Sequence, residues 1–341
     1  MFIQVAKLLY DCEALTLDEI AQGIEKMQGL KTKESWKRLK YLVFAILGWQ
    51  SMLYKPAFRV CDLDEFAVVE DDETNSGLVF DVFRVPASLA DRPLYVLLKA
   101  FGNLLPAPPI GLTAVASEYS KEASSWTPLY PAEINAYLLH KLLRIRIRWV
   151  DSLALHLDYD KASKTLSLFR YPSFCVAMLH SKGGIYSFAS TEQNGFDPRA
   201  SEADILYFFQ EVLLSFRLLF GQNSRSRKHF LRAHANQSYG QVDSFLPFLC
   251  MTKNVESVSH LIPKDQPIYF ANQHFPTPFQ KVEHITKELQ KAKPKSVGDL
   301  FHDRRNTLQY WTFWLVSIIG GLSIILSLIQ VVLQGLQLGR S

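Results

Sequence analysis

The sequence predicts an α+β fold, in which a mostly helical soluble domain is followed by one C-terminal transmembrane helix. Apolar residues recur at helical spacing over much of the chain, two short segments alternate apolar and polar residues, and residues 311–333 are almost all apolar. The 341 residues carry a formal net charge of +4, which is modest for a nucleic-acid-binding protein. The four cysteines are far apart, which argues against a disulfide framework or a zinc ribbon.

Residues 1–60 are predicted to be a helical, winged-helix-like region. Thr16, followed three residues later by Glu19, has the pattern of a capping box, so a helix should begin there. A second helix over 33–48 and an extended segment complete a pattern that resembles a winged helix, whose second helix enters the major groove in DNA-binding versions. The alternative is a helical hairpin that packs on its own domain or on a partner. We favour the hairpin, because a membrane tether keeps the domain away from chromatin.

Residues 61–300 are predicted to form an α+β cytosolic domain. Ile145–Val150 and Thr165–Phe169 both alternate apolar and polar residues on either side of a polar turn, which predicts a β-hairpin; one helix over 136–158 is the alternative. We interpret His156, between two leucines, as a partly exposed histidine on a strand face. The other expected elements are a strand at 77–85, helices at 88–104, 131–143, 201–220 and 281–291, and a basic helix that starts near 225.

The end of the chain divides into a basic and aromatic juxtamembrane segment at 301–310, a transmembrane helix at 311–333 and a short tail at 334–341. A helix rises about 1.5 Å per residue, so the apolar stretch is long enough to cross a hydrocarbon core of about 30 Å. Trp311, Phe313 and Trp314 suit the membrane–water interface at its start.

Charge predicts the orientation of this helix. Basic residues, including Arg304 and Arg305, lie mainly upstream, and Arg340 follows. Because positive charge favours the cytoplasmic side, we expect a single-pass protein with a cytosolic N-terminal domain in an organelle that the sequence leaves open. The position of the helix predicts tail-anchored insertion after synthesis. Gly320 and Gly321 are part of the anchor, and small residues there would permit homodimerisation through it, although such residues are common in spanning helices.

The sequence contains no catalytic motif that we accept. Asp71-Asp72-Glu73 has the outline of the aspartate-rich motif of terpene cyclases, but that family's second metal motif is missing, and a solvated acidic loop fits better. The chain lacks the metalloprotease, hydrolase-elbow and phosphate-loop motifs. We therefore nominate no catalytic residue, no cofactor and no metal ligand, and we lean against an enzyme.

Two groups of basic residues are candidates for a surface interaction: Arg144, Arg146 and Arg148 on one expected strand, and Arg225, Arg227 and Lys228 after the helix at 201–220. Beside a membrane, such clusters can contact anionic headgroups. The equally weighted alternative is a solvated face that pairs with the acidic loop.

Three parts of the chain together look familiar: residues 147–156 with 168–175, residues 209–222 with Ser226-Arg-Lys228, and residues 303–314. On these stretches the chain resembles a large group of uncharacterised filamentous-fungal proteins that end in one hydrophobic helix. The resemblance covers residues 140–335, and it implies a C-terminal anchor but no activity. The tail is also similar to magnesium channels of the CorA type, but the second spanning helix and the Gly-Met-Asn signature are missing, so we do not expect a channel.

These observations predict a membrane-tethered cytosolic interaction module that contacts the lipid bilayer and a protein partner; we do not expect a nucleic-acid partner. One alternative is a membrane-associated enzyme that acts on a lipophilic small molecule, as in fungal secondary metabolism. Another is a DNA-binding protein that cleavage releases from the membrane. A deep apolar cavity with converging Asp, Glu or His side chains would favour the enzyme, and a flat surface over a filled core would favour the module.

Overall fold

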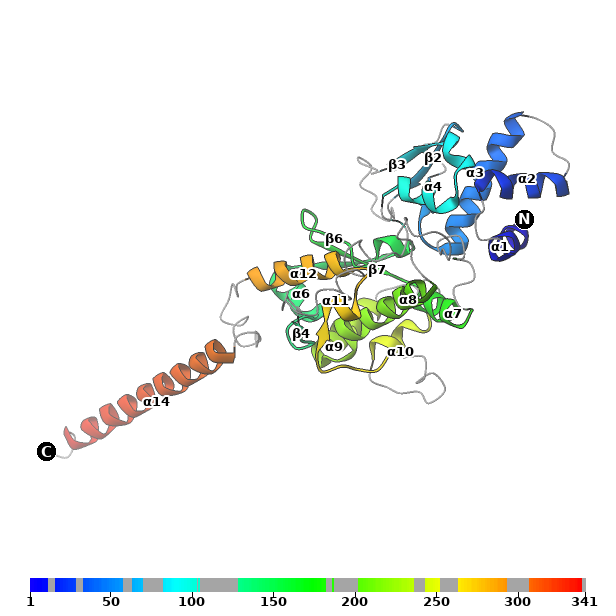
Figure 1. The fold of residues 1–341 in the computed structure, drawn as a ribbon. Coiled ribbons are helices and arrows are strands. Elements are labelled where there is room, and N and C mark those ends of the chain that lie inside the picture. Colours follow the sequence, from blue (N-terminus) through cyan, green and yellow to red (C-terminus); the bar gives the residue numbers. More distant parts are fainter. Residues whose placement is uncertain are drawn as a thin grey trace, which may run out of the picture.

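The structure is a computed structural model that describes residues 1–11, 16–28, 33–57, 63–69, 82–102, 104, 128–181, 186, 202–235, 243–251, 263–292 and 307–338. Most of this part of the chain is helical, and its strands form small sheets of two or three strands. Figure 1 shows a smaller N-terminal lobe, a larger lobe, and one long helix that extends away from both.

The N-terminal lobe combines helices with a three-stranded antiparallel sheet of order β1-β2-β3. Its elements are α1 (Phe2–Asp11), α2 (Leu17–Gln28), α3 (Lys33–Ser51), β1 (Lys55–Pro56), β2 (Glu65–Val69), β3 (Val82–Pro86), the 3-10 helix η1 (Ala87–Asp91) and α4 (Leu94–Ala100). The predicted capping box is confirmed: the Thr16 N–H donates to Glu19 Oε2 at 2.9 Å, and the Glu19 N–H donates to Thr16 Oγ1 at 3.1 Å.

The core of this lobe is centred on Phe44 of α3. Its ring contacts those of Tyr54, Phe66 and Phe101, with centroid distances of 4.7, 4.9 and 5.6 Å. Because Phe66 lies in β2 and Phe101 follows α4, these contacts join the helices to the sheet. The buried Tyr54 hydroxyl donates to the Phe44 carbonyl at 2.7 Å, which satisfies its donor. The winged-helix interpretation of the region is not confirmed and stays a prediction.

The helix predicted at 88–104 is wrong as a single element, because η1 and α4 are separate. Pro93 lies between them and holds Arg92 in an extended conformation, with φ −88° and ψ 154°. The strand predicted at 77–85 is found in part as β3, and the residues before position 82 lie outside the described part of the chain, as do Asp71 to Glu73.

The larger lobe is built mainly from helices around α8. Its elements are β4 (Pro128–Leu129), α6 (Ala136–Leu143), β5 (Arg146–Val150), the 3-10 helix η2 (Leu153–Leu155), β6 (Tyr159–Asp160), β7 (Thr165–Phe169), α7 (Pro172–His180), α8 (Glu202–Phe216), the π-helical segment η4 (Arg217–Gly221), α9 (Ser224–Ala235), α10 (Leu246–Cys250), β8 (Tyr269–Phe270), α11 (Ala271–His274) and α12 (Phe279–Lys291). Short strands β4 and β8 pair with each other.

The predicted hairpin is confirmed in part: the two-residue strand β6 pairs antiparallel with β7 across the turn at 161–164. The strand predicted over Ile145–Val150 is not an antiparallel arm of it, because β5 (Arg146–Val150) pairs with β7 in parallel, in a sheet of order β5-β7-β6. Residues 151–158 lie between β5 and β6, where Leu153–Leu155 form η2. A single helix over 136–158 is also excluded, because α6 ends at Leu143.

The two lobes are joined by hydrogen bonds to the end of α3. The Leu153 N–H donates to the Met52 carbonyl at 2.7 Å, and the Ser152 hydroxyl donates to the Leu53 carbonyl at 2.5 Å. The hydroxyl of buried Tyr186 donates to the Ser51 carbonyl. Their buried hydrophobic residues form one continuous core.

The long helix in Figure 1 is α14 (Thr307–Leu338). Its segment Trp311–Gly335 has 25 residues with a mean hydropathy of 2.4, and none of it is buried against the rest of the protein. It is thus one C-terminal helix that is long and apolar enough to cross a membrane.

Candidate functional sites

The apolar surface of α14 is the first candidate site. Trp311 is 70% exposed, and the large side chains from Leu315 to Leu333 are exposed as well. A core helix of comparable composition would be covered by its neighbours. A Cβ atom built on Gly320 or Gly321 would meet nothing within 4 Å, so both glycines lie on open helix surface. Arg304 and Arg305 lie outside the described residues.

Two serine hydroxyls within α14 are hydrogen-bonded to the helix itself. The Ser323 hydroxyl donates to the Ile319 carbonyl at 2.9 Å, and the Ser327 hydroxyl donates to the Ser323 carbonyl at 2.9 Å. Hydroxyl groups bonded in this way can lie in a hydrocarbon environment, because they leave no donor unsatisfied. The serines are therefore compatible with a spanning helix.

Helices α6 and α9 pack together and carry the second predicted basic group and one residue of the first, Arg144. These helices pack in parallel: Arg225 lies over the ring of Tyr137 at 5.6 Å, and His140 and His229 have ring centroids 4.6 Å apart. Burial lowers the pKa of His229, as do the nearby His140 and Arg232. Arg144 is the left-handed residue that ends α6, and β5 begins at Arg146, so the expectation that Arg144 shares a strand with Arg146 and Arg148 is wrong.

We call the exposed side chains Arg144, Arg225, Lys228 and Arg232 the basic α6–α9 surface. Helix α9 contains no acidic residue, and within the described part of the chain the structure records no ion pair for these four residues. Two polar contacts fix the helix pair: the Tyr137 N–H donates to Ser226 Oγ at 3.1 Å, and the Ser226 hydroxyl donates to Asn135 Oδ1 at 3.0 Å. The surface is therefore rigidly held and not neutralised locally.

The other predicted basic residues have different partners. Arg148 donates to the Ser167 hydroxyl at 2.9 Å, and Arg227 donates to the Gly221 carbonyl at 2.7 Å. Arg146 is exposed on β5. Arg148 and Arg227 thus support the fold through these hydrogen bonds.

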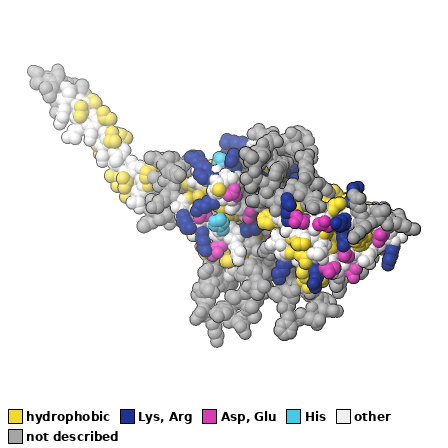
Figure 2. Space-filling view, turned by 90° about the horizontal axis from the view of Figure 1, so that it is seen from above, with side chains coloured by type: hydrophobic (Ala, Val, Ile, Leu, Met, Phe, Trp, Pro, Cys, Tyr) yellow, Lys and Arg dark blue, Asp and Glu magenta, His cyan; other side chains and the backbone are white. Residues whose placement is uncertain are grey.

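Helix α12 provides a contrast, because its basic residues are paired. Figure 2 shows Lys and Arg interspersed with Asp and Glu on the face seen from above. On α12, Lys287 lies 2.8 Å from Glu283, and Glu288 is 3.1 Å from Lys161. This is the mixed, solvated kind of face that needs no partner.

A buried serine–histidine pair resembles a catalytic dyad, but its hydrogen bond runs in the wrong direction for catalysis. His156 Nε2 lies 2.8 Å from Ser215 Oγ, while His156 Nδ1 accepts the Phe169 N–H at 3.1 Å. Nδ1 is therefore the unprotonated nitrogen, and Nε2 donates to the serine, whose own proton goes to the Val212 carbonyl at 2.7 Å. A general base would have to accept that proton.

His156 is also closed to solvent, so the expectation of a partly exposed histidine is wrong. Burial, followed by the charge of Lys281, lowers its pKa to about 3. The reason is its position in the crossover between β5 and β7, where it packs under α8 instead of on a strand face. We assign it a structural role that joins the crossover to α8.

Glu211 of α8 is a buried carboxyl group. Its side chain accepts the Thr277 N–H at 3.1 Å and the Thr277 hydroxyl at 3.3 Å, and the residue is 3% exposed. Burial raises its pKa to about 8, although the two hydrogen bonds act in the opposite direction. No cluster of three or more His, Cys, Asp or Glu side chains suited to a metal ion occurs within the described residues.

The π-helical segment η4 carries a buried arginine. Arg217 donates to the Asp265 carboxylate at 2.7 and 2.8 Å, and to the carbonyls of Leu249 and Met251 at 2.9 and 2.8 Å. Its guanidinium fills the space beside Gly221, where an added Cβ would lie 2.7 Å from Arg217 Cζ. This clasp ties the end of α8 to α10 and to the segment at 263–266.

A groove of about 560 Å³ runs along one side of α8. Helices α7 and α8 each contribute residues at positions i, i+3 and i+4, which share one helix face. These residues are Val176, Leu179 and His180 of α7, and Gln210, Leu213 and Leu214 of α8.

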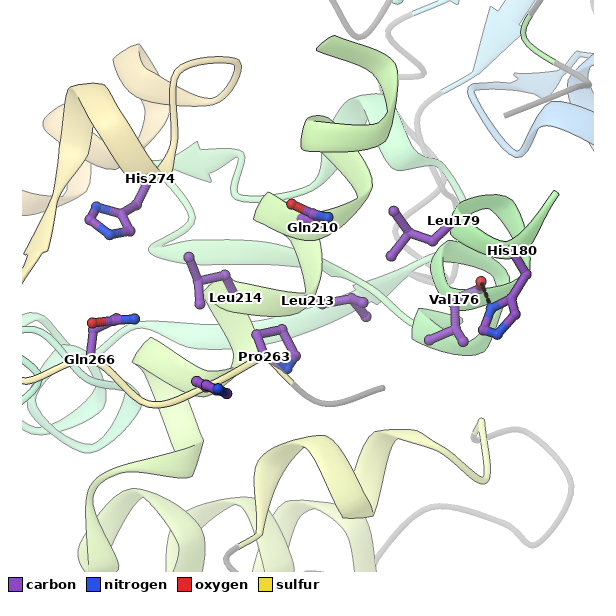
Figure 3. A pocket seen from close by; sticks show the side chains of 10 residues that line it. Val176, Leu179, His180, Gln210, Leu213, Leu214, Pro263, Gln266 and His274 are labelled. Atoms are coloured by element: carbon purple, nitrogen blue, oxygen red, sulfur yellow. Dashed lines mark hydrogen bonds between the residues drawn. The ribbon is translucent and has the colours of Figure 1, made fainter. Parts of the chain in front are cut away.

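The third wall of the groove is formed by Pro263, Lys264, Gln266 and His274. In Figure 3, Gln266 and His274 lie at one end of the groove, and Val176 and Leu179 lie at the other. No carboxylate occurs among the described residues that line it. The groove therefore combines apolar walls with polar and cationic side chains, but its described lining offers no acid–base pair of carboxylate and histidine.

Comparison of the chain with protein-family models, with curated proteins and with solved structures finds no match, so the resemblance to fungal proteins stays a prediction and the function must be argued from these sites.

Proposed function

We propose that this chain is a single-pass membrane protein whose helical domain, on the cytosolic side, is a non-enzymatic interaction module for a protein partner. The observation that carries the proposal is the uncovered apolar segment Trp311–Gly335 of α14. Twenty-five helical residues span about 37 Å, somewhat more than a hydrocarbon core of about 30 Å, so the segment can cross with a tilt. Leaving so large an apolar surface in water would favour aggregation.

We assign the partner contact to the basic α6–α9 surface. Helix α9 has no acidic residue, and within the described residues no ion pair is recorded for the four cationic side chains, so a complementary acidic surface would supply the balancing charge. The helix pair beneath is fixed by buried hydrogen bonds, which reduces the ordering cost of binding. The second experiment below tests whether anionic lipid headgroups occupy this surface in place of a protein.

The tether is tested with Leu322→Arg/Ile325→Arg in the full-length chain. Each arginine near the centre of a spanning helix costs about 2.5–3.5 kcal/mol of insertion free energy. The unaltered chain should stay in the membrane pellet after alkaline carbonate extraction, and the double variant should move to the soluble fraction. The matched control, Leu322→Ile/Ile325→Leu, should behave as the unaltered chain. Extraction of the unaltered chain by carbonate would refute the tether.

The partner surface is tested with Arg225→Glu/Lys228→Glu, and Lys26→Glu/Lys99→Glu in the N-terminal lobe is the control of equal charge change. Proximity labelling in cells should lose specific neighbours only in the α9 variant, while carbonate resistance is unchanged. Equal loss in both variants would show a nonspecific charge effect. The surface would be assigned to lipid instead if the purified chain binds anionic vesicles, the α9 variant alone loses this binding, and its protein neighbours in cells are unchanged.

A further inference from the structure

The groove beside α8 has the size of a small-molecule site and is lined by both apolar and polar side chains. Its volume of about 560 Å³ lies within the range of about 300–1,000 Å³ that is typical of small-molecule sites. Along α7 and α8 the walls are formed by Val176, Leu179, Leu213 and Leu214, with His180 and Gln210 as their polar side chains. Gln266 and His274 lie together at the other end, as Figure 3 shows. The groove thus has a largely apolar wall and, away from Val176 and Leu179, a polar end.

The lining also carries a positive charge that no described lining residue neutralises. Lys264, two residues before Gln266 in the chain, is exposed, and within the described residues the structure records no ion pair for it. The adjacent acid, Asp265, is engaged by Arg217 through two hydrogen bonds of 2.7 and 2.8 Å. Asp265 therefore balances the buried arginine rather than the lysine, and the same clasp holds this wall of the groove in place.

His274 adds a donor at the same end without needing a charge. Its Nδ1 accepts the Phe270 N–H at 3.0 Å, a shorter contact than the 3.3 Å to the Phe270 carbonyl. Nδ1 is then the unprotonated nitrogen, so Nε2 carries the hydrogen in the neutral ring. A cationic lysine, an imidazole N–H and the Gln266 amide are together suited to an anionic group that accepts several hydrogen bonds.

We propose that the groove binds a single-chain amphiphile with a carboxylate head, that is, a long-chain fatty acid. The hydrocarbon chain lies against the apolar side chains of α7 and α8, and the carboxylate lies at the end formed by Lys264, Gln266 and His274. Positive charge without a balancing acid selects an anionic head over a neutral or cationic one, and the apolar walls favour an acyl chain. This site is separate from the membrane helix and from the α6–α9 surface, and the proposal does not depend on either.

The test uses the full-length chain in nanodiscs of phosphatidylcholine and a photoreactive analogue of palmitic acid, with labelled peptides mapped by mass spectrometry. Saturable labelling should fall on α7 and α8. Unlabelled palmitate should compete, and hexadecanol and hexadecylamine should compete about tenfold more weakly, because the alcohol has no charge to pair with Lys264 and the amine is a cation that Lys264 repels. Labelling confined to α14, labelling that never saturates, or equal competition by hexadecylamine would overturn the proposal.

Two variants locate the site. Leu214→Trp fills the groove and should abolish saturable labelling, and Lys264→Glu, at an exposed position with little risk to folding, should weaken it by about three- to tenfold. Lys228→Glu, which has the same charge change on α9, should label as the unaltered chain. Unchanged labelling of Lys264→Glu refutes the assigned head-group end, whatever the effect of Leu214→Trp. Carbonate extraction remains an independent readout, so failure here leaves the tether proposal untouched.

Discussion

The buried carboxyl group of Glu211 should make this protein less stable as the pH rises. Its pKa is about 8 in the folded chain, against an ordinary value of 4.5. Between these values the folded state keeps a proton that the unfolded state has lost, so stability is full below pH 4.5 and is lost as the pH rises towards 8. At 1.36 kcal/mol per pKa unit the upper bound is roughly 4–5 kcal/mol, and relaxation around the ionised group reduces this to about 2–4 kcal/mol.

Glu211→Gln tests this reasoning, because glutamine keeps the shape and an oxygen that accepts from Thr277. At pH 9 the variant should unfold at a temperature about 5–10 °C higher than the unaltered chain, as expected for a few kcal/mol in a domain of this size. At pH 5, where both side chains are neutral, the two unfolding temperatures should nearly coincide. The measurement is thermal unfolding of the full-length chain in nanodiscs, followed by tryptophan fluorescence.

Glu283→Gln is the matched control, since the partly exposed Glu283 of α12 forms an i,i+4 ion pair with Lys287. Its loss should change stability by less than about 0.5 kcal/mol at either pH. An equal shift for Glu211→Gln at pH 5 and pH 9, or a lower unfolding temperature at pH 9, would show that Glu211 does not carry a buried proton.

Three further predictions concern stability and use the same assay. Because the pKa of His156 is lowered to about 3, its contribution to the free energy of unfolding is full above pH 6.5 and is lost as the pH falls towards 3. In the Glu211→Gln background, His156→Gln should therefore flatten the decline of unfolding temperature between pH 6.5 and 4. An unchanged slope would contradict this. Asp265→Ala should destabilise by about 2–4 kcal/mol, because it leaves the buried charge of Arg217 with carbonyl partners only, and a change below about 1 kcal/mol would argue against the clasp. Thr16→Ala should cost about 0.5–2 kcal/mol through loss of the N-cap, with Thr16→Ser as the control that retains the hydroxyl.

The elements that the sequence predicts correctly are governed by local interactions. The capping box needs only Thr16 and Glu19, which are three residues apart, and the helix at 201–220 has a wide apolar face that any neighbour could cover. The helix at 281–291 is confirmed as α12 for the same reason, since Val282, Ile285 and Leu289 form one buried stripe.

Apart from the helix at 88–104, which Pro93 divides, the predictions that fail depend on contacts between distant residues. Alternating residues in β5 and β7 indicate strands, but they do not say that the two strands pair in parallel across a crossover. The polarity of the His156–Ser215 pair depends on the Phe169 N–H, which periodicity does not reveal. The groove is assembled from three segments that are separated in the sequence, so no local pattern predicts it. The sequence does indicate helix α7, because Pro172 is typical of a first helical turn, and Val176 and Leu179 lie on one face of that helix.

The contact between Arg217 and Gly221 has a consequence for sequence variation. The guanidinium occupies the volume that any side chain at 221 would need, so the two positions should change together. Among related sequences, a residue larger than glycine at 221 is expected only where 217 has lost its arginine, and a charge at 265 should disappear from the same sequences.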